Sequence, residues 1–340
     1  MKAAVIEKAK EIRLMDVPLP VLEDGETLIR VKFCGVCGSD IHIQQGHHPT
    51  AKFPVIPGHE FVGEFVEAKG KGADRFQKGD LVVAQPYYSC GYCEACAKGH
   101  DNVCTSLQFM GAHRNGGFAE YVKVLTRKTY ALPKGLDPQL ASLIEPLAVA
   151  VHDVRRSGLQ VGETALVVGG GPIGILIALV ARDAGARKVV IFETNDFRRK
   201  FARELGFEAI NPLADDFEKQ ILPAAKKGGY HVSYEVSGTQ AGINAAIKYT
   251  KTTGTVMVIG IMKDLCPINL SDIFAKELRL EGVRIHEQYH YVGAIELMRT
   301  GKLDKELHAL ISKRYTLNEI EEAFAFSMVP GDYFKVLVEI

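Results

Sequence analysis

Four cysteines form the densest group of potentially reactive residues in the chain: Cys90, Cys93, Cys96 and Cys104, spaced C-x2-C-x2-C-x7-C. Four thiolates satisfy the tetrahedral coordination of Zn²⁺ completely. Cysteines two residues apart seldom reach disulfide geometry without strain, so the spacing favours a metal over two disulfides. A site filled by four protein ligands leaves no position for a substrate. We therefore expect this four-cysteine cluster to be structural, with the chemistry elsewhere in the chain.

A second constellation joins the segments Cys37-Gly-Ser-Asp-Ile-His42 and Gly58-His-Glu60. Together they offer Cys37, His59 and Glu60, which is three ligands with one position open, as a catalytic zinc requires. Each residue alone is weak evidence, because a lone cysteine is often a core residue and a lone histidine is often structural. The pair Cys34 and Cys37 also has redox C-x-x-C spacing, but its β-rich flanks are not the βαβ setting of that motif.

The segment from Leu166 to Gly174 reads as strand, G-x-G-x-x-G turn and helix, the pattern of a dinucleotide site. Gly169 permits the tight turn, Gly171 lets the backbone approach a pyrophosphate, and Gly174 lets the helix pack on the strand. The pyrophosphate would lie at the helix N-terminus, which begins with Pro172 and Ile173.

An acidic residue follows at the expected distance, because Glu193 closes the second strand nineteen residues after Gly174. A carboxylate there accepts hydrogen bonds from ribose hydroxyls and repels a 2′-phosphate, which favours NAD over NADP. The alternative interpretation is a solvated glutamate at a strand end. Arg198 either offsets part of the repulsion or lies over the adenine ring.

The chain divides into segments with different sequence patterns. Residues 1 to 146 are β-rich, with short apolar runs between glycine, proline and aspartate turns. The expected strands here are Leu28–Phe33, Gly63–Val66, Leu81–Ala84 and Ala119–Val124. Beyond Glu145, strands and helices alternate, which indicates a doubly wound parallel sheet. The expected elements there are the strands Thr164–Gly169, Lys188–Glu193, Tyr230–Val236, Thr255–Ile259 and Leu278–Val283 and the helices Pro172–Ala184 and Phe197–Leu205. The last fifty residues lose this alternation, with helices at Tyr291–Thr300 and Leu317–Phe324 and a strand at Phe334–Ile340.

Composition narrows the functional classes. Lys+Arg and Asp+Glu both number 41, so the formal net charge is zero and nothing indicates nucleic acid or an anionic membrane as a partner. No stretch of 18 uncharged apolar residues is present, and the N-terminal residues do not resemble a secretory signal. The seven cysteines, mostly placed as metal ligands, are typical of a reducing compartment, and we expect a cytoplasmic protein.

The motifs in chain order resemble those of one family. The words CGSDIH, GHE, the four-cysteine cluster, GGFAEY, IEPLAVAVH and GGGPIG are similar to those of the zinc-dependent medium-chain dehydrogenase/reductases, the alcohol dehydrogenase-like enzymes. The resemblance covers essentially all 340 residues and implies an α/β fold. It implies a GroES-like β-rich catalytic domain at 1–146, with a structural-zinc lobe at 86–106. It also implies a Rossmann NAD-binding domain with a doubly wound parallel sheet at 147–286 and a return segment to the catalytic domain at 287–340.

The resemblance also implies roles around the second constellation. Cys37 and His59 would be ligands of a catalytic zinc. Glu60 follows the family's GHE motif, and in polyol-type members the glutamate at this position can bind the metal directly. Glu145 stands where plain alcohol dehydrogenases place a second cysteine, and a glutamate there marks the polyol and diol branch. Whether it ligates zinc or holds a zinc-bound water stays open. 

Proton transfer and cofactor binding complete these expectations. Ser39 would take the alcohol proton, His42 would pass it to solvent, and Asp40 would orient His59. The resemblance adds five cofactor residues beyond the glycine-rich turn: Ile259, Gly260, Ile261, Arg284 and His286.

The expected reaction is NAD-dependent oxidation of a secondary alcohol to a ketone, with two Zn²⁺ per chain. The segments His42–Gly58 and Met110–Gly117 look most like those of enzymes acting on sugar acids such as galactonate or gulonate. A neutral polyol, 2,3-butanediol and threonine are the alternatives. A sugar acid needs a cation for its carboxylate, and the candidates are Arg114, Arg284, His48 and His113.

Three rival interpretations are less well supported. A zinc-ribbon binding module without catalysis would fit the four-cysteine cluster, but the zero net charge argues against nucleic acid. A zinc-free quinone reductase would lack Cys37, His59 and Glu145. A catalytically idle relative stays open. The family commonly forms homodimers or homotetramers, and the segment Leu278–Val283 offers an edge strand for pairing.

Overall fold

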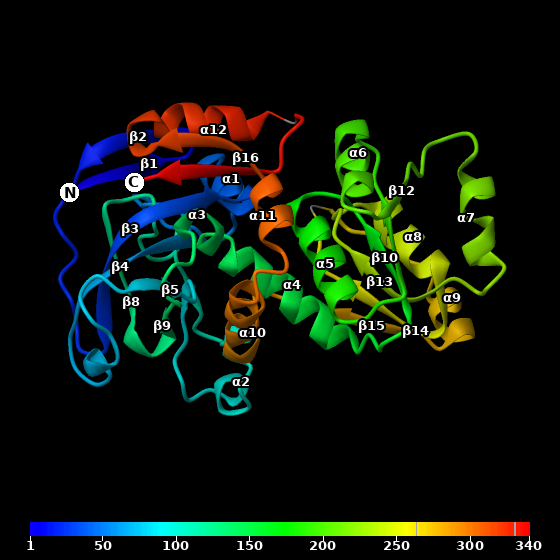
Figure 1. Cartoon of the computed structure of the whole chain (residues 1–340), viewed down its shortest axis with the longest axis horizontal. Coiled ribbons are helices and arrows are strands. Elements are labelled where there is room, and N and C mark those ends of the chain that lie inside the picture. Colours follow the sequence, from blue (N-terminus) through cyan, green and yellow to red (C-terminus); the bar gives the residue numbers. More distant parts are fainter. Residues whose placement is uncertain (263, 330) are drawn as a thin grey trace. The chain divides into compact units, whose positions relative to one another are not determined.

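The structure is a computed structural model that describes residues 1–262, 264–329 and 331–340. It divides into two compact units (Figure 1). Unit 1 comprises Met1–Ala148 and Glu287–Ile340, and unit 2 comprises Val149–His286. The helix α4 (Ile144–Ser157) carries the chain from the first unit into the second.

A seven-stranded sheet forms the body of unit 1, in the order β16-β17-β3-β4-β5-β9, with β8 also paired to β3. Its strands are β3 (Glu26–Val36), β4 (Glu60–Ala68), β5 (Leu81–Ala84), β8 (Tyr121–Leu125), β9 (Thr129–Ala131), β16 (Ile311–Thr316) and β17 (Lys335–Glu339). The smaller strands are β1 (Lys2–Lys8), β2 (Glu11–Asp16), β6 (Tyr87–Tyr88) and β7 (Gln108–Phe109). The helices are α1 (Gly38–Gln44), α2 (Glu94–Ala97), α3 (Pro138–Ala141), α10 (Gln288–Arg299), α11 (Asp304–Leu310) and α12 (Ile320–Met328).

The C-terminal segment returns to this sheet. Strand β17 pairs antiparallel with β3, and Val338 lies opposite Cys34. In Figure 1 the red β17 accordingly lies beside the blue β3. The core closes over the pairing: Phe118 meets Phe324 of α12 edge to face, with ring centroids 5.6 Å apart, and both are fully buried. Unit 1 is therefore built from both ends of the chain, which explains why the last fifty residues lose the alternation of strand and helix.

Unit 2 contains a six-stranded parallel sheet in the order β12-β11-β10-β13-β14-β15. Its strands are β10 (Thr164–Val168), β11 (Lys188–Phe192), β12 (Glu208–Ile210), β13 (Tyr230–Glu235), β14 (Thr250–Val258) and β15 (Arg279–Gly282). Its helices are α5 (Pro172–Asp183), α6 (Asp196–Glu204), α7 (Phe217–Ala225), α8 (Gln240–Tyr249) and α9 (Leu270–Lys276). The sequence Thr-Ala-Leu-Val-Val of β10 is buried throughout, as expected of a central strand covered on both faces. The sheet order confirms the predicted doubly wound fold, and β15 is its edge strand, as predicted.

Candidate active site

A buried carboxylate fixes the loop that carries the second constellation. Asp40 lies in the first turn of α1 and is fully buried. Its Oδ2 accepts a hydrogen bond from the backbone N–H of Cys37 at 2.9 Å, and its Oδ1 accepts one from Gly58 at 2.9 Å. Asp40 therefore ties the start of α1 to the segment before His59. Gly58 has φ +95°, and a Cβ there would lie 2.7 Å from the Phe118 ring, so no other residue fits this turn.

The fold brings Cys37, His59 and Glu60 together, with one ligand atom from each lying within 4.8 Å of the others. Cys37 precedes α1, His59 precedes β4, and Glu60 begins β4. Among the described residues the three join one group although the segments are some twenty positions apart in sequence. A thiolate, an imidazole and a carboxylate are the donor types that zinc accepts, and three protein ligands leave a fourth position open.

The imidazole of His59 is buried among negatively charged groups. It is 4% exposed, and its two nitrogens have only distant neighbours: Nε2 lies 3.5 Å from Ser39 Oγ, and Nδ1 lies 3.5 Å from Asp40 Oδ1. Burial by itself lowers the pKa of His59, but the negative charges of Asp40 and Cys37 outweigh it and raise this pKa well above its ordinary value. The surroundings of this ring thus favour positive charge, which a bound Zn²⁺ would supply.

Glu60 has a partner that the sequence analysis missed. Its carboxylate forms a buried ion pair with the ammonium group of Lys335, which comes from β17 and also donates to the backbone oxygen of Val36 at 3.2 Å. Burial lowers the pKa of Lys335, but Glu60, Cys37 and Glu145 raise it above its ordinary value overall. In the sequence, the feature that pointed to Lys335 was a single lysine in the apolar final strand. Its role as the partner of Glu60 could be recognised only once β17 was known to pair with β3.

Glu145 lies in the first turn of α4 and is 6% exposed. It is outside the group formed by Cys37, His59 and Glu60, yet its charge acts on Lys335 and on the pKa of Tyr291. The structure thus favours Glu60 over Glu145 as the third protein ligand. On α1, Ser39 adjoins His59, and His42 follows three residues later on the same side of the helix.

The four-cysteine cluster also assembles. The ligand atoms of Cys90, Cys93, Cys96 and Cys104 all lie within 4.8 Å of one another, and all four are free of disulfides. Backbone N–H groups of Cys90 and Ser106 each lie 3.3 Å from the Cys104 sulfur. Backbone N–H groups of Cys96 and Thr105 lower the pKa of Cys93, which favours the thiolate form that a metal requires. The four donors and these N–H contacts fit a closed zinc site.

The predicted dinucleotide turn opens a cavity of about 780 Å³ in unit 2. Gly169 has φ +106°, and a Cβ on Gly174 would lie 1.9 Å from the Gly169 carbonyl oxygen, so both glycines are required by the backbone. The predicted residues that line the cavity are Gly169, Gly171, Pro172, Ile173, Glu193 and Arg198. The carboxyl ends of β10 and β11 therefore form a cleft of the size and position expected for a dinucleotide.

Glu193 is held by the turn that it faces. Its Oε2 accepts a hydrogen bond from Gly170 N–H at 2.7 Å, and its Oε1 accepts one from Asn195 N–H at 2.8 Å. The side chain of Arg198 reaches toward Gly171, where an added Cβ would lie 3.7 Å from its Nη1. The Nε of Arg198 is buried without a hydrogen-bond partner. A carboxylate and a guanidinium thus both border the cleft.

Five predicted cofactor residues do not line this cavity: Ile259, Gly260, Ile261, Arg284 and His286. The first two are nevertheless fixed beside it, because the N–H groups of Ile259 and Gly260 both donate to the Glu235 carbonyl oxygen, at 3.0 and 2.9 Å. Ser237 and Thr239, which the sequence analysis did not name, do line the cavity. Thr239 caps α8 by accepting from Gly242 N–H, so a Ser-x-Thr at the end of a strand was the available signal.

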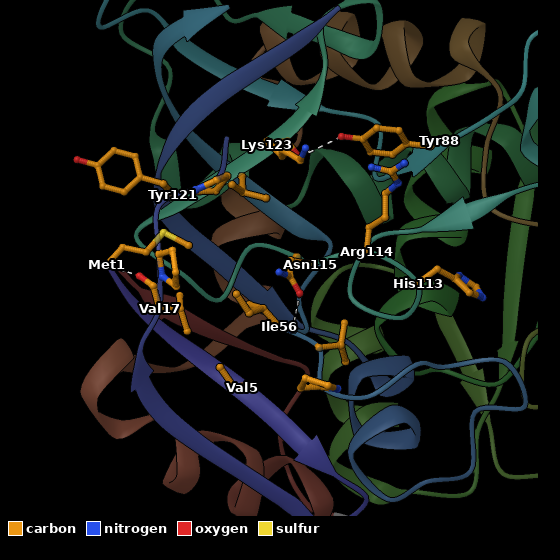
Figure 2. Close-up of a pocket in the computed structure, with 16 residues that line it drawn as sticks. Met1, Val5, Val17, Ile56, Tyr88, His113, Arg114, Asn115, Tyr121 and Lys123 are labelled. Atoms are coloured by element: carbon orange, nitrogen blue, oxygen red, sulfur yellow. Dashed lines mark hydrogen bonds between the residues drawn. The ribbon is translucent and has the colours of Figure 1, made fainter. Parts of the chain in front are cut away.

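Arg114 borders a different cavity of about 540 Å³ in unit 1, whose lining includes none of Cys37, His59 and Glu60 (Figure 2). Its guanidinium carbon lies 3.9 Å from the centre of the Tyr88 ring, and its Nε donates to Gln108 Oε1 at 2.6 Å. The buried carboxylate of Glu26 lies 3.8 Å from its Nη1. The charge of Arg114 is thus already engaged within the unit, which weakens its candidacy for a substrate carboxylate.

His113 is similarly engaged. Its Nδ1 accepts from the Phe109 N–H at 3.0 Å, and its Nε2 lies 2.9 Å from Thr50 Oγ1. The Phe109 ring packs on His59, with centroids 4.9 Å apart. His113 therefore positions a residue that adjoins the metal-ligand group.

Comparisons with known proteins agree with this arrangement. Residues 23–134 match the alcohol dehydrogenase GroES-like domain, and residues 172–300 match the zinc-binding dehydrogenase domain. A 2-dehydro-3-deoxy-L-galactonate 5-dehydrogenase of Pseudoalteromonas atlantica is 38% identical over 93% of this chain and 92% of its own length. An L-galactonate-5-dehydrogenase of Escherichia coli is 33% identical over 95% of this chain and 94% of its own.

A solved structure shares the whole fold. A chain described as a zinc-binding dehydrogenase from Sinorhizobium meliloti, bound to NADP, superposes with a TM-score of 0.90 at 33% identity, covering 100% of this chain and 99% of its own. Among the described residues, no helix combines the length and apolar character needed to cross a membrane. By its domains, its relatives and its fold, the chain belongs to the zinc-dependent medium-chain dehydrogenase/reductase family, the alcohol dehydrogenase-like enzymes, and is an oxidoreductase.

Proposed function

We propose that the protein is an NAD-dependent dehydrogenase that oxidises a secondary alcohol of a sugar acid or related polyol to a ketone. The observation that carries this proposal is the assembly of Cys37, His59 and Glu60 into an open three-ligand group. The four-cysteine cluster would hold a second, structural zinc. When bound, the catalytic zinc supplies a Lewis acid that lowers the pKa of a hydroxyl group, and NAD supplies the hydride acceptor.

The residues of the chain then have separate roles in metal binding, proton transfer and cofactor binding. Cys37, His59 and Glu60 would hold the metal, and Asp40, whose Oδ1 lies 3.5 Å from Nδ1 of His59, would orient that ring. Ser39, beside His59, accepts the proton of the substrate hydroxyl, and His42 passes it to solvent. Unit 2 binds the dinucleotide at the turn formed by residues 169–174. Glu145 contributes negative charge without direct ligation.

NAD is the proposed cofactor because Glu193 presents a fixed carboxylate at the end of β11. A 2′-phosphate beside that carboxylate is electrostatically unfavourable, although the relative of known structure holds NADP and Arg198 borders the same cleft. Steady-state kinetics with both dinucleotides test this assignment. A twentyfold or greater preference for NADP would refute it.

The substrate class rests on the two galactonate-type relatives. Arg114 is engaged by Glu26, and the other candidate cations for a carboxylate are Arg284, His48 and His113. The test is an NAD-reduction screen of zinc-replete enzyme across aldonates, sorbitol, 2,3-butanediol and threonine, with metal analysis of the same sample. About two zinc per chain and the highest kcat/KM on an aldonate are expected. A higher kcat/KM on threonine or butanediol would replace the sugar-acid assignment without removing the dehydrogenase one.

We also propose that the enzyme is a cytoplasmic homo-oligomer. Strand β15 forms an edge of its sheet, and the neighbouring helix α9 exposes Leu270 and Phe274, at 69% and 85%. The open edge of such a strand, beside exposed apolar side chains, favours pairing with a second copy. Two zinc sites that require reduced thiols suit the cytoplasm. Light scattering after gel filtration should give a dimer or tetramer, and a monomer at micromolar concentration would contradict this.

A further inference from the structure

Basic side chains from three neighbouring strands of unit 2 line a small cavity. His231 of β13, Lys251 of β14 and Arg279 of β15 all stand near the amino ends of their strands. The cavity has a volume of about 110 Å³. Its lining includes four hydroxyl residues: Ser157, Thr252, Thr253 and Thr255. The dinucleotide cleft opens at the carboxyl ends of the same parallel strands, so this second cavity is separate from it.

An interruption in β14 builds one wall of the cavity. Between two successive pairing positions on β13, Tyr230 and Val232, strand β14 advances from Thr250 to Thr255. The extra residues form a bulge in which Thr253 takes φ +62°. Left-handed backbone is costly for a β-branched residue, and such strained positions persist where the surrounding structure or function requires them. The bulge places Lys251 and its neighbouring hydroxyls around the His231 ring.

In the contact between His231 and Lys251, an imidazole N–H group faces an ammonium group, and both are hydrogen-bond donors. Nδ1 of His231 lies 3.0 Å from the backbone N–H of Thr164 and therefore acts as an acceptor. Burial, together with Lys251 and Arg187, lowers the pKa of His231, so the ring is neutral at pH 7 and carries its single proton on Nε2. That Nε2–H group lies 3.2 Å from the Nζ of Lys251. An ammonium group cannot donate to it, and both groups require an acceptor from outside.

The charge around this pair is positive. Lys251 and Arg279 line the cavity, and Arg187 is close enough to affect the pKa of His231. Glu163 is the opposing carboxylate in the lining, and its Oε2 already accepts from Gln160 N–H at 2.8 Å. Arg279 donates through Nε and Nη2 to Thr255 Oγ1. Three cations against one anion leave a site that attracts negative charge.

We propose that this cavity binds a small tetrahedral oxyanion, as free phosphate or as the phosphate of a monoester, with its oxygens accepting from His231 Nε2–H and the Lys251 ammonium. A water occupies about 30 Å³ in the liquid, so a cavity of about 110 Å³ has room for a few waters. That space suits a small oxyanion and is too small for a drug-sized ligand. Of the lining hydroxyls, Ser157 and Thr253 already donate to the carbonyl oxygens of Val154 and Thr252, each at 2.7 Å, so Thr252 and Thr255 are the candidates for further donors. This site is independent of the proposed catalytic function.

The test is calorimetric titration of the zinc-replete, NAD-saturated enzyme at constant ionic strength, so that the dinucleotide cleft is already filled. Inorganic phosphate and glucose 6-phosphate are the two probes. Saturable binding of either is expected, and the stronger probe identifies the source of the oxyanion. Lys251→Met should weaken binding at least about tenfold, because a charge-assisted hydrogen bond is lost. Glu163→Gln should strengthen it, because a repelling carboxylate is removed.

The matched control is Lys188→Met. Lys188 is the first residue of β11, so it also lies at the amino ends of the parallel strands. It pairs with Glu208 at 2.5 Å and is not part of the cavity lining. This variant loses the same charge and should bind phosphate with unchanged affinity. Two results would overturn the proposal: no saturable heat with either probe up to about 10 mM, or equal weakening in both lysine variants. The first would mean that water alone fills the cavity, and the second that only net charge matters.

Discussion

At the scale of single residues, the candidate metal site depends on how buried charges are paired. Cys37, His59 and Glu60 meet in a region where Asp40 is fully buried and Lys335 is the nearby cation. The local field raises the pKa of His59 although burial alone would lower it. Such an excess of buried negative charge is costly unless a cation compensates it.

The first prediction concerns the thiolate ligand. Cys37→Ala should reduce the metal content from about two zinc to about one per chain and remove nearly all turnover, because two remaining ligands hold zinc poorly. Metal analysis and circular dichroism on the same sample measure both effects. The fold should persist, since Cys37 precedes α1 and is only partly buried. Near-wild-type turnover in a metal-verified sample would refute the ligand assignment.

The second prediction concerns Asp153, which is buried on α4 with its Oδ2 lacking a hydrogen-bond partner. Burial raises the pKa of Asp153 well above its ordinary value of 3.8. Above pH 4 the folded state therefore binds more protons at this group than the unfolded state, so its contribution to stability falls as the pH rises toward the folded pKa. Asp153→Asn cannot ionise and should become more stable relative to the wild type with rising pH, by up to about 1.4 kcal/mol per pH unit.

Urea unfolding of both proteins between pH 5 and pH 8 measures this difference. A difference in unfolding free energy that stays constant across this range would show that the Asp153 carboxyl does not titrate as its burial requires.

At the scale of elements, the return of the C-terminal segment completes the site. Strand β17 pairs with β3 and thereby places Lys335 against Glu60 of β4. The sequence of β17 by itself does not indicate that this strand borders a metal site. The ion pair exists only because segments separated by 275 positions become neighbours in one sheet.

The third prediction tests this ion pair. In metal-free protein, Lys335→Met should destabilise the fold by about 3–5 kcal/mol, because it leaves the buried Glu60 carboxylate without a counter-charge. Adding Glu60→Gln to that variant should recover much of the loss, because the uncompensated charge is removed. Lys335→Arg serves as the control that keeps the charge. Denaturant unfolding of the wild type, Lys335→Met, Glu60→Gln and the double variant gives the coupling energy. A coupling below about 0.5 kcal/mol would show that the pair is not formed.

At the scale of the whole molecule, we expect the two predicted metal sites to have different roles within unit 1. The four-cysteine cluster lies on a lobe whose elements are all short: β6, α2 and the 3₁₀ turn Asp101–Val103. Asp101 anchors this lobe by accepting from Lys128 at 2.6 Å and from Tyr87 at 3.0 Å. A lobe with so little regular structure depends on its crosslinks for order.

The fourth prediction follows from that dependence. Cys104→Ser should lower zinc content to about one per chain and reduce the thermal midpoint or the oligomeric state, because a three-ligand site no longer closes the lobe. The kcat per remaining catalytic zinc should stay within about twofold of the wild type, since no hydride-transfer group is removed. Differential scanning calorimetry and metal analysis provide the measurements. A complete loss of turnover with an unchanged thermal midpoint would give the cluster a direct catalytic role.

The sequence alone determined the features that are local in the chain. Cysteine spacing, the glycine-rich turn between an apolar strand and a helix, and the alternation of strands and helices each express short-range geometry. The predicted family, fold class and dehydrogenase activity were confirmed for this reason. The edge position of β15 was also readable, because strand order follows a recurring pattern in doubly wound sheets.

The tertiary structure decided what depends on long-range pairing. It grouped Glu60 with Cys37 and His59 and left Glu145 outside that group, a choice that spacing left open. It placed Lys335 on Glu60, engaged Arg114 with Glu26, and gathered His231, Lys251 and Arg279 at one cavity. These contacts join strands far apart in the sequence, and a side chain's partner is fixed by sheet register and burial, neither of which a local pattern encodes.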